Sequence, residues 1–194
     1  SRPEMNPEAG EQTCLYDAFI SYSRKDEKFA RKLEADLERY LPPKGVLAGR
    51  RKLNIFRDIQ DLVGNELGVA IREALRQSRY MIVVCSPNAH ASPWVGLEVQ
   101  QFVEFHGKER IIPVLLSGRP NSKVKPDDEL QDKAFPESVC GCLEDPLAAD
   151  FREEQFPGET AAHRKMRFHE AKFQVLALLL GKQKEELLQR QRVR

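Results

Sequence analysis

Short apolar runs alternate with longer amphipathic segments along the chain, and this alternation constrains the fold more than any other feature of the sequence. The clearest run, Tyr80–Cys85, is unbroken in its apolar character, which is typical of strands buried on both faces of a parallel sheet. Similar runs predict further strands at Tyr16–Ser21, Leu53–Phe56 and Ile111–Leu116. Pro113 within the last run indicates an edge-like or irregular portion. A short fifth strand is predicted near Ser138–Cys142.

The amphipathic segments between these runs predict helices at Lys25–Leu41, about Asn65–Ser78, Ser92 to about Phe105, and about Ala161–Gly181. Each places apolar residues on one face at helical spacing. In chain order, the residues expected to face inward are Phe29, Leu33 and Leu37; Leu67, Ile71, Ala74 and Leu75; and, in the last helix, Met166, Phe173, Leu176 and Leu180.

Two serines mark predicted helix starts. Ser23, with Asp26 three residues later, predicts a capping-box start for the first helix. Ser92 followed by Pro93 places a capping hydroxyl before a proline at the first helical position. Pro42 and Pro43 end the first helix.

Alternation of strands and helices at this spacing predicts right-handed βαβ units, and therefore a parallel sheet covered on both faces. We predict an α/β fold, a flavodoxin-like three-layer sandwich with a five-stranded parallel sheet in the order 2-1-3-4-5. Ligands bind outside the carboxyl ends of the strands in such sheets. This rule nominates Ser21–Arg24, Arg57–Gly64 and Cys85–Glu98 as site segments.

Charge, apolar runs and cysteine spacing argue against several classes of function and indicate how the chain divides into segments. The net charge of +1 argues against direct nucleic-acid binding. The apolar runs are shorter than the roughly 20 residues of a transmembrane helix. The cysteines lack zinc-site spacing, so we expect no metal and a cytoplasmic protein with reduced thiols. We expect a flexible leader at 1–14, one folded domain at 15–181, and at 182–194 a charged helical tail or a linker to a missing module.

Motifs at the predicted strand ends carry a family resemblance. Tyr16–Tyr22 reads YDAFISY, Phe56-Arg57-Asp58 is followed by Gly64, and Trp94–Glu98 has the form W-x-x-x-E. Cys85-Ser86-Pro87 and Ile112-Pro113-Val114 fit the same order. The chain therefore resembles a TIR (Toll/interleukin-1 receptor) domain, well over Tyr16–Leu116 and loosely beyond. The motifs are most similar to those of bacterial TIR proteins.

The resemblance implies an activity. Many TIR domains of bacteria, plants and one animal group consume NAD⁺, with the Glu of W-x-x-x-E as the catalytic residue, whereas others only assemble with one another. For this chain it implies a hydrolase that cleaves the nicotinamide–ribose bond to give nicotinamide and ADP-ribose or a cyclic isomer. It also implies homotypic TIR–TIR assembly and a role in bacterial defence or effector signalling. Since no G-x-G-x-x-G or Walker A motif is present, NAD⁺ would be a substrate and not a bound cofactor.

One carboxylate suffices for this chemistry. Nicotinamide leaves a cationic pyridinium as a neutral molecule and needs no general acid, so the group to be stabilised is the oxocarbenium-like ribosyl centre. Glu98 lies one helical turn after Trp94, on the same face. We expect Glu98 to be catalytic and Trp94 to wall the nicotinamide pocket. The alternative is a core Trp94 with Glu98 capping or ion-pairing the loop beneath it.

Substrate-binding candidates follow the first two strands. By the resemblance, Tyr22, Ser23 and Arg24 contact ribose or phosphates, and Arg24 suits a phosphate. Ser23 has the alternative role of helix cap. Arg57 and Asp58 begin the family's BB loop, where Asp58, Gln60 and Asp61 form either a mobile lid and assembly surface or an ordinary solvated loop. We expect a cleft bounded by Tyr22–Arg24, Arg57–Asp61 and Trp94–Glu98, with Glu98 partly exposed.

Three functions remain in competition. The first is NAD⁺ cleavage, and the second is a TIR scaffold that signals by homotypic assembly without chemistry. The third is a relative of nucleoside deoxyribosyltransferases, which share the parallel sheet and a glutamate but act on nucleosides. The FISY opening and the W-x-x-x-E motif speak against the third.

Overall fold

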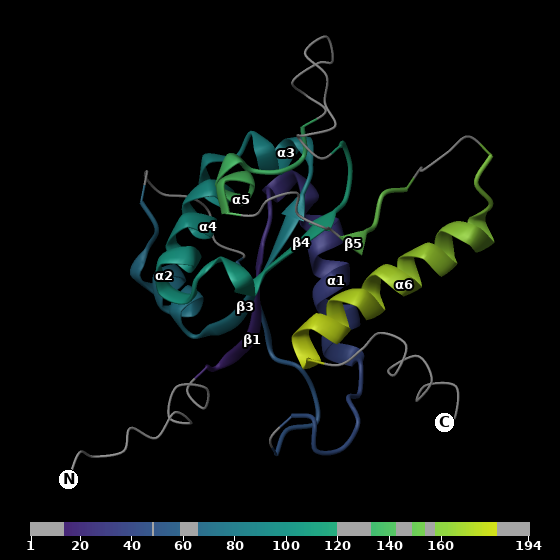
Figure 1. The fold of residues 1–194 in the computed structure, drawn as a ribbon, viewed down its shortest axis with the longest axis horizontal. Helices are drawn as coiled ribbons and strands as arrows, with labels where there is room; N and C mark the ends of the chain where they lie inside the picture. Colours follow the sequence, from purple (N-terminus) through teal and green to yellow (C-terminus); the bar gives the residue numbers. More distant parts are fainter. Residues whose placement is uncertain are drawn as a thin grey trace.

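A five-stranded parallel sheet forms the centre of the molecule (Figure 1). The computed structural model describes residues 14–47, 49–58, 66–119, 133–142, 149–153 and 158–181. The strand order β2-β1-β3-β4-β5 confirms the predicted flavodoxin-like α/β topology. The strands are β1 (Tyr16–Ser21), β2 (Ile55–Arg57), β3 (Ser78–Cys85), β4 (Ile111–Leu115) and β5 (Ala149–Asp150).

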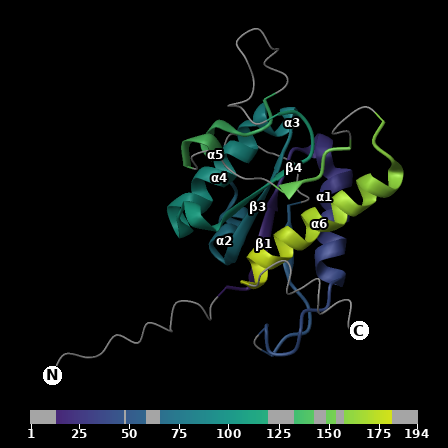
Figure 2. The same ribbon diagram turned by 45° about the vertical axis from the view of Figure 1, so that its right-hand side comes forward.

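Helices cover both faces of the sheet (Figures 1 and 2). One face carries α1 (Glu27–Arg39), which follows the 3₁₀ turn η2 (Arg24–Asp26), and α6 (Ala161–Leu180). The other carries α2 (Val69–Arg76), α4 (Pro93–His106) and α5 (Glu137–Cys142). The remaining elements are short: α3 (Pro87–His90) and the 3₁₀ turn η3 (Lys108–Arg110). No helix among the described residues is long and apolar enough to cross a membrane.

Strand β1 distributes its side chains between the two cores. Ala18, Ile20 and Tyr22 pack in the core beneath α1 and α6. Phe19 packs in the core beneath α2 and α4. Because side chains alternate along a strand, Ser21 points to the same side as Phe19. This alternation determines which residue at the end of β1 reaches α4.

Two predicted elements of the sheet differ in the structure. The segment Ser138–Cys142 is not a strand, because it lies within α5, where the Val139 amide donates to the carbonyl of Pro136. The position beside β4 is taken by Ala149 and Asp150, which pair with Val114 and Leu115. The prediction failed because two consecutive paired residues leave no period-2 pattern for the sequence to show. Strand β2 begins at Ile55, two residues later than predicted.

The predicted inward faces of the helices are largely correct, with Ile71, Ala74 and Leu75 buried on α2. Leu67 precedes α2 but packs against the same core. Met166 is 59% exposed, so its predicted burial is wrong: it lies in the N-terminal half of α6, whereas the buried residues of this helix begin at Ala171. Of the predicted leader at 1–14, residues 1–13 lie outside the described residues, as do the predicted tail at 182–194 and residues 59–65 of the second loop.

The two predicted serine caps have opposite outcomes. Ser92 caps α4 as predicted, its Oγ accepting from the Val95 amide at 3.3 Å. Ser23 makes no side-chain capping bond, so the predicted capping box is wrong. A 3₁₀ turn intervenes before α1, and the carboxylate of Asp26 is bound elsewhere, as described below.

Candidate active site

Glu98 occupies a position on α4 where an apolar residue is expected. The buried residues of this helix are Val95, Glu98, Val99 and Phe102, which follow the i, i+3, i+4, i+7 spacing of a core-facing stripe. Glu98 is only 1% exposed. A carboxyl group therefore lies within the apolar face that α4 turns toward the sheet.

The two oxygens of this carboxyl group have different surroundings. Ser21 Oγ, at the carboxyl end of β1, donates to Glu98 Oε1 at 2.8 Å. Glu98 Oε2 is buried and has no hydrogen-bond partner among the residues that the structure describes. An unsatisfied buried acceptor commonly costs about 1–3 kcal/mol of folding free energy. A loss of folding free energy that no compensating contact offsets is typical of functional sites.

Burial raises the pKa of Glu98 well above its ordinary value. The hydrogen bond from Ser21 opposes this rise, and the negative charge of Asp58 adds to it. In the closed site the neutral carboxyl group is therefore favoured. A positive charge brought next to Oε2 would reverse the balance, because it stabilises the ionised form.

Tyr22 and Arg57 hold one another and the chain that follows β2. The Tyr22 hydroxyl donates to the carbonyl oxygen of Asp58 and accepts from Arg57 Nη1 at 3.0 Å. Burial raises the pKa of Tyr22, so the phenol remains a proton donor. Arg57 Nε also binds Glu34 Oε2 of α1 at 2.5 Å, and Glu27 lies 3.8 Å from its Nη1. The charge of Arg57 is thus already compensated by α1.

The loops after β1 and β3 are joined by a contact that the sequence did not reveal. Asp26 is buried and accepts from Ser86 Oγ at 2.5 Å and from Asn88 Nδ2 at 3.1 Å. Ser86 Oγ also caps α3 by accepting from the Ala89 amide. The Ser-Pro pattern that predicted the cap at Ser92 occurs here too and could have indicated this second cap.

The structure brings several of the predicted site residues to one edge of the sheet. Tyr22, Arg57, Asp58 and Glu98 surround the carboxyl ends of β1 and β2, as their contacts show. The expectation of a partly exposed Glu98 is wrong, since the side chain is closed off from solvent.

The remaining candidates lie around this group. Trp94 is half-buried and packs against the core beneath α4. Ser23 is half-buried, with its carbonyl accepting from the Asp26 amide, and Arg24 is exposed at the start of η2. Gln60 and Asp61 lie outside the described residues. The predicted contacts of Ser23, Arg24 and Trp94 with ribose, phosphate or nicotinamide stay predictions.

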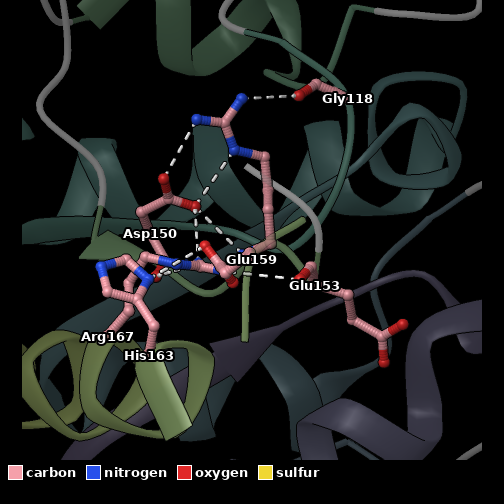
Figure 3. Close-up of polar contacts among 7 residues, drawn as sticks. Gly118, Asp150, Glu153, Glu159, His163 and Arg167 are labelled. Atoms are coloured by element: carbon pink, nitrogen blue, oxygen red, sulfur yellow. Dashed lines mark hydrogen bonds and ion pairs between the residues drawn. The ribbon is translucent and has the colours of Figure 1, made fainter. Parts of the chain in front are cut away.

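A second cluster of polar side chains lies at the end of β5, and its members form hydrogen bonds and ion pairs with one another (Figure 3). Asp150 forms two bonds of 3.0–3.1 Å with the Arg152 guanidinium, and Arg167 of α6 binds Glu159 at 2.9 Å. His163 lies 3.3 Å from the other Glu159 oxygen. Arg167 Nη1 also lies 3.8 Å from Asp150 Oδ1, which links α6 to the end of β5, and we interpret the cluster as structural. Within the described ranges, no His, Cys, Asp or Glu side chains gather in a group that could hold a metal ion.

Comparison with known proteins gives consistent matches. A sequence model of the TIR domain matches residues 18–164. The chain is 34% identical over 181 residues to the NAD(+) hydrolase ApTIR of Actinoplanes sp., which covers 89% of this chain and 24% of that protein. It is 33% identical over 120 residues to Protein toll of Drosophila melanogaster, covering 60% of this chain and 10% of that protein. The chain thus spans about a quarter and a tenth of these relatives.

Among solved structures, the TIR domains of the activated Roq1 resistosome match with a TM-score of 0.54 at 21% identity. The match covers 80% of this chain and 98% of that chain. At this level of identity the similarity concerns the fold.

Proposed function

The chain belongs to the TIR domain family, and we propose that it hydrolyses NAD⁺ at the nicotinamide–ribose bond with Glu98 as its catalytic residue. The observation that carries the proposal is the unpartnered Oε2 of Glu98, buried at the carboxyl edge of a parallel sheet. This edge is where such sheets bind their ligands. The similarity to an NAD(+) hydrolase supports the choice of substrate.

The proposed step uses the charge of Glu98. As the C1′–N bond breaks, nicotinamide leaves as a neutral molecule and positive charge develops on the ribosyl carbon. Carboxylate Oε2 beside that carbon stabilises the charge in a site from which bulk water is excluded. Water then attacks C1′, and its proton passes by way of the carboxylate to solvent. The sum is NAD⁺ plus water giving nicotinamide, ADP-ribose and a proton. Attack by a group of the substrate itself in place of water would give a cyclic isomer.

Ionisation of Glu98 is coupled to substrate in this scheme. Burial favours the neutral carboxyl group. The cationic nicotinamide ring lowers the pKa of a neighbouring carboxyl group, so the bound substrate produces the form of Glu98 that acts on it. In the absence of NAD⁺, no substrate charge opposes this effect of burial.

The substrate must gain access to Glu98, which is 1% exposed. We propose that homotypic assembly opens the edge formed by the ends of β1 and β2, and that activity therefore depends on self-association. The biological setting that fits is bacterial defence or effector signalling in the cytoplasm, where NAD⁺ is present and cysteine thiols such as that of Cys85 stay reduced.

The closed environment of Glu98 also favours a second candidate, a TIR scaffold that assembles without chemistry. In that case the carboxyl group would remain buried in every state of the protein. The two functions differ in a single observable, the release of nicotinamide.

The test is to incubate the chain at high and at low concentration with NAD⁺ and, separately, with a nucleoside, and to follow the released base by chromatography. Nicotinamide released from NAD⁺, and not by the Glu98→Gln variant, supports the proposal. Base released only from the nucleoside indicates a deoxyribosyltransferase. Release of neither, even when the domain is clustered artificially, leaves the scaffold and overturns the hydrolase.

A further inference from the structure

The last residue of β1 contacts the proposed catalytic carboxyl group. Ser21 is fully buried, and its hydroxyl donates to Glu98 Oε1 at 2.8 Å across 77 positions of sequence. We propose that Ser21 is a positioning residue: it holds Oε1 so that Oε2 is the oxygen presented to the ribose. The inference rests on the proposed function and gives a role to Ser21, which the family resemblance left without one.

The fold places this hydroxyl where it is needed. Ser21 pairs with Val83 of β3, and it follows Phe19 on the side of the sheet that α4 covers. Its neighbour Tyr22 points to the opposite side and binds Arg57 and Asp58. Two consecutive residues at the end of β1 therefore hold the helix that carries Glu98 and the chain that leaves β2.

The contact is directional. An ionised carboxylate has only acceptors, so in the reactive form of Glu98 the Ser21 hydroxyl must donate. A hydroxyl has one proton to give, and it is committed to Oε1. The remaining charge is concentrated on Oε2, which has no partner. Ser21 also fixes the rotation of the carboxyl group, because no other described residue forms a hydrogen bond that would orient it.

A second buried serine shows the ordinary alternative. Ser78, at the opposite end of the sheet on β3, is also fully buried, and its Oγ donates to the carbonyl oxygen of Ala74 at 2.6 Å. That bond stabilises the junction between α2 and β3 and touches no ionisable group. Ser78→Ala is therefore a matched control, because it removes the same atom from an equally buried site.

Ser21→Ala is expected to lower kcat for NAD⁺ cleavage about 10- to 100-fold, the range for losing a hydrogen bond to a charged group. KM is expected to stay near the wild-type value, because Ser21 does not touch substrate. The acid limb of the pH profile should move to higher pH, since the lost bond favoured the ionised form of Glu98. Ser78→Ala should leave the acid limb in place. Should Ser21→Ala not fold, Ser21→Cys keeps a weak donor and should show a smaller shift in the same direction.

The pKa of Glu98 gives a readout that needs no substrate. It can be followed by carbon NMR of labelled glutamate carboxyls, with Glu98→Gln assigning the signal, and it should be higher in Ser21→Ala than in the wild type. If the wild type cleaves NAD⁺ and Ser21→Ala keeps the full kcat and the same acid limb, the positioning role of Ser21 is overturned, and the proposed function is not. A wild type that never releases nicotinamide overturns the proposed function, whatever the NMR titration shows.

Discussion

Replacement of Glu98 by Gln removes the charge at the proposed reacting oxygen and keeps the size of the side chain. The amide oxygen can still accept from Ser21 Oγ, as Oε1 does now. At the position of Oε2, an NH₂ group replaces an oxygen that already lacks a partner. The substitution therefore tests the charge with little change in packing.

The expected effect on activity is large. Loss of one preorganised electrostatic contact in an active site commonly costs about 10²–10³ in rate. Cleavage of NAD⁺ by Glu98→Gln should therefore be reduced by at least that factor, measured as nicotinamide released at saturating NAD⁺.

The thermal stability of Glu98→Gln is expected to exceed that of the wild type, by an amount that depends on pH. Because the pKa of Glu98 is raised in the folded state, its stabilising contribution is complete below the ordinary pKa and is lost as the pH rises through the folded-state pKa. Within that window the wild type loses about 1.4 kcal/mol per pH unit from this group. A domain of this size changes its Tm by about 2–4 °C per kcal/mol, so Glu98→Gln should gain about 3–6 °C on the wild type per pH unit.

The assay is thermal denaturation of both proteins over a pH series, together with nicotinamide release. Asp58→Asn is the control, because the charge of Asp58 raises the pKa of Glu98 from outside the reaction. It should shift the pH profile to lower pH and leave bond cleavage intact. A Tm difference between Glu98→Gln and wild type that does not change with pH would refute the buried neutral carboxyl group, and unchanged cleavage would refute its catalytic role.

Two further predictions concern the stability of β1 and the assembly of the domain. Asp17 is buried, and its carboxylate accepts two hydrogen bonds of 2.8 Å from Arg50 and one of 2.7 Å from the backbone amide of Asn54. Burial raises the pKa of Asp17, but these hydrogen bonds and the positive charges of Arg50 and Arg79 outweigh the effect of burial. The pKa of Asp17 is therefore lowered below 3.8. Asp17→Asn should therefore cost about 1–3 kcal/mol at neutral pH, and in chemical denaturation this difference should shrink as the pH falls below 3.8 through the folded-state pKa. Separately, NAD⁺ cleavage should rise faster than linearly with protein concentration, and strictly proportional activity in the dilute monomer would exclude activation by assembly.

Local patterns in the sequence were sufficient for most of the fold. The unbroken apolar run that ends at Cys85 predicted strand β3, and the Ser-Pro step at Ser92 predicted the start of α4. Strand order followed from the rules for βαβ units, and the order of the motifs at the strand ends identified the family. These features depend on neighbours within a few residues, which a sequence displays directly.

Contacts between distant segments were decided by the tertiary structure alone. The motif nominated Glu98, but not its burial or its bond to Ser21, which depend on how α4 packs on β1. Arg57 was a substrate-binding candidate at the end of β2, yet α1 brings Glu34 to it. A pKa and a hydrogen-bond partner depend on everything within a few ångströms, whereas periodicity reports only which side of its own helix or strand a residue occupies. The burial, hydrogen bonding and pKa of Glu98 therefore depend on the packing of α4 against the end of β1.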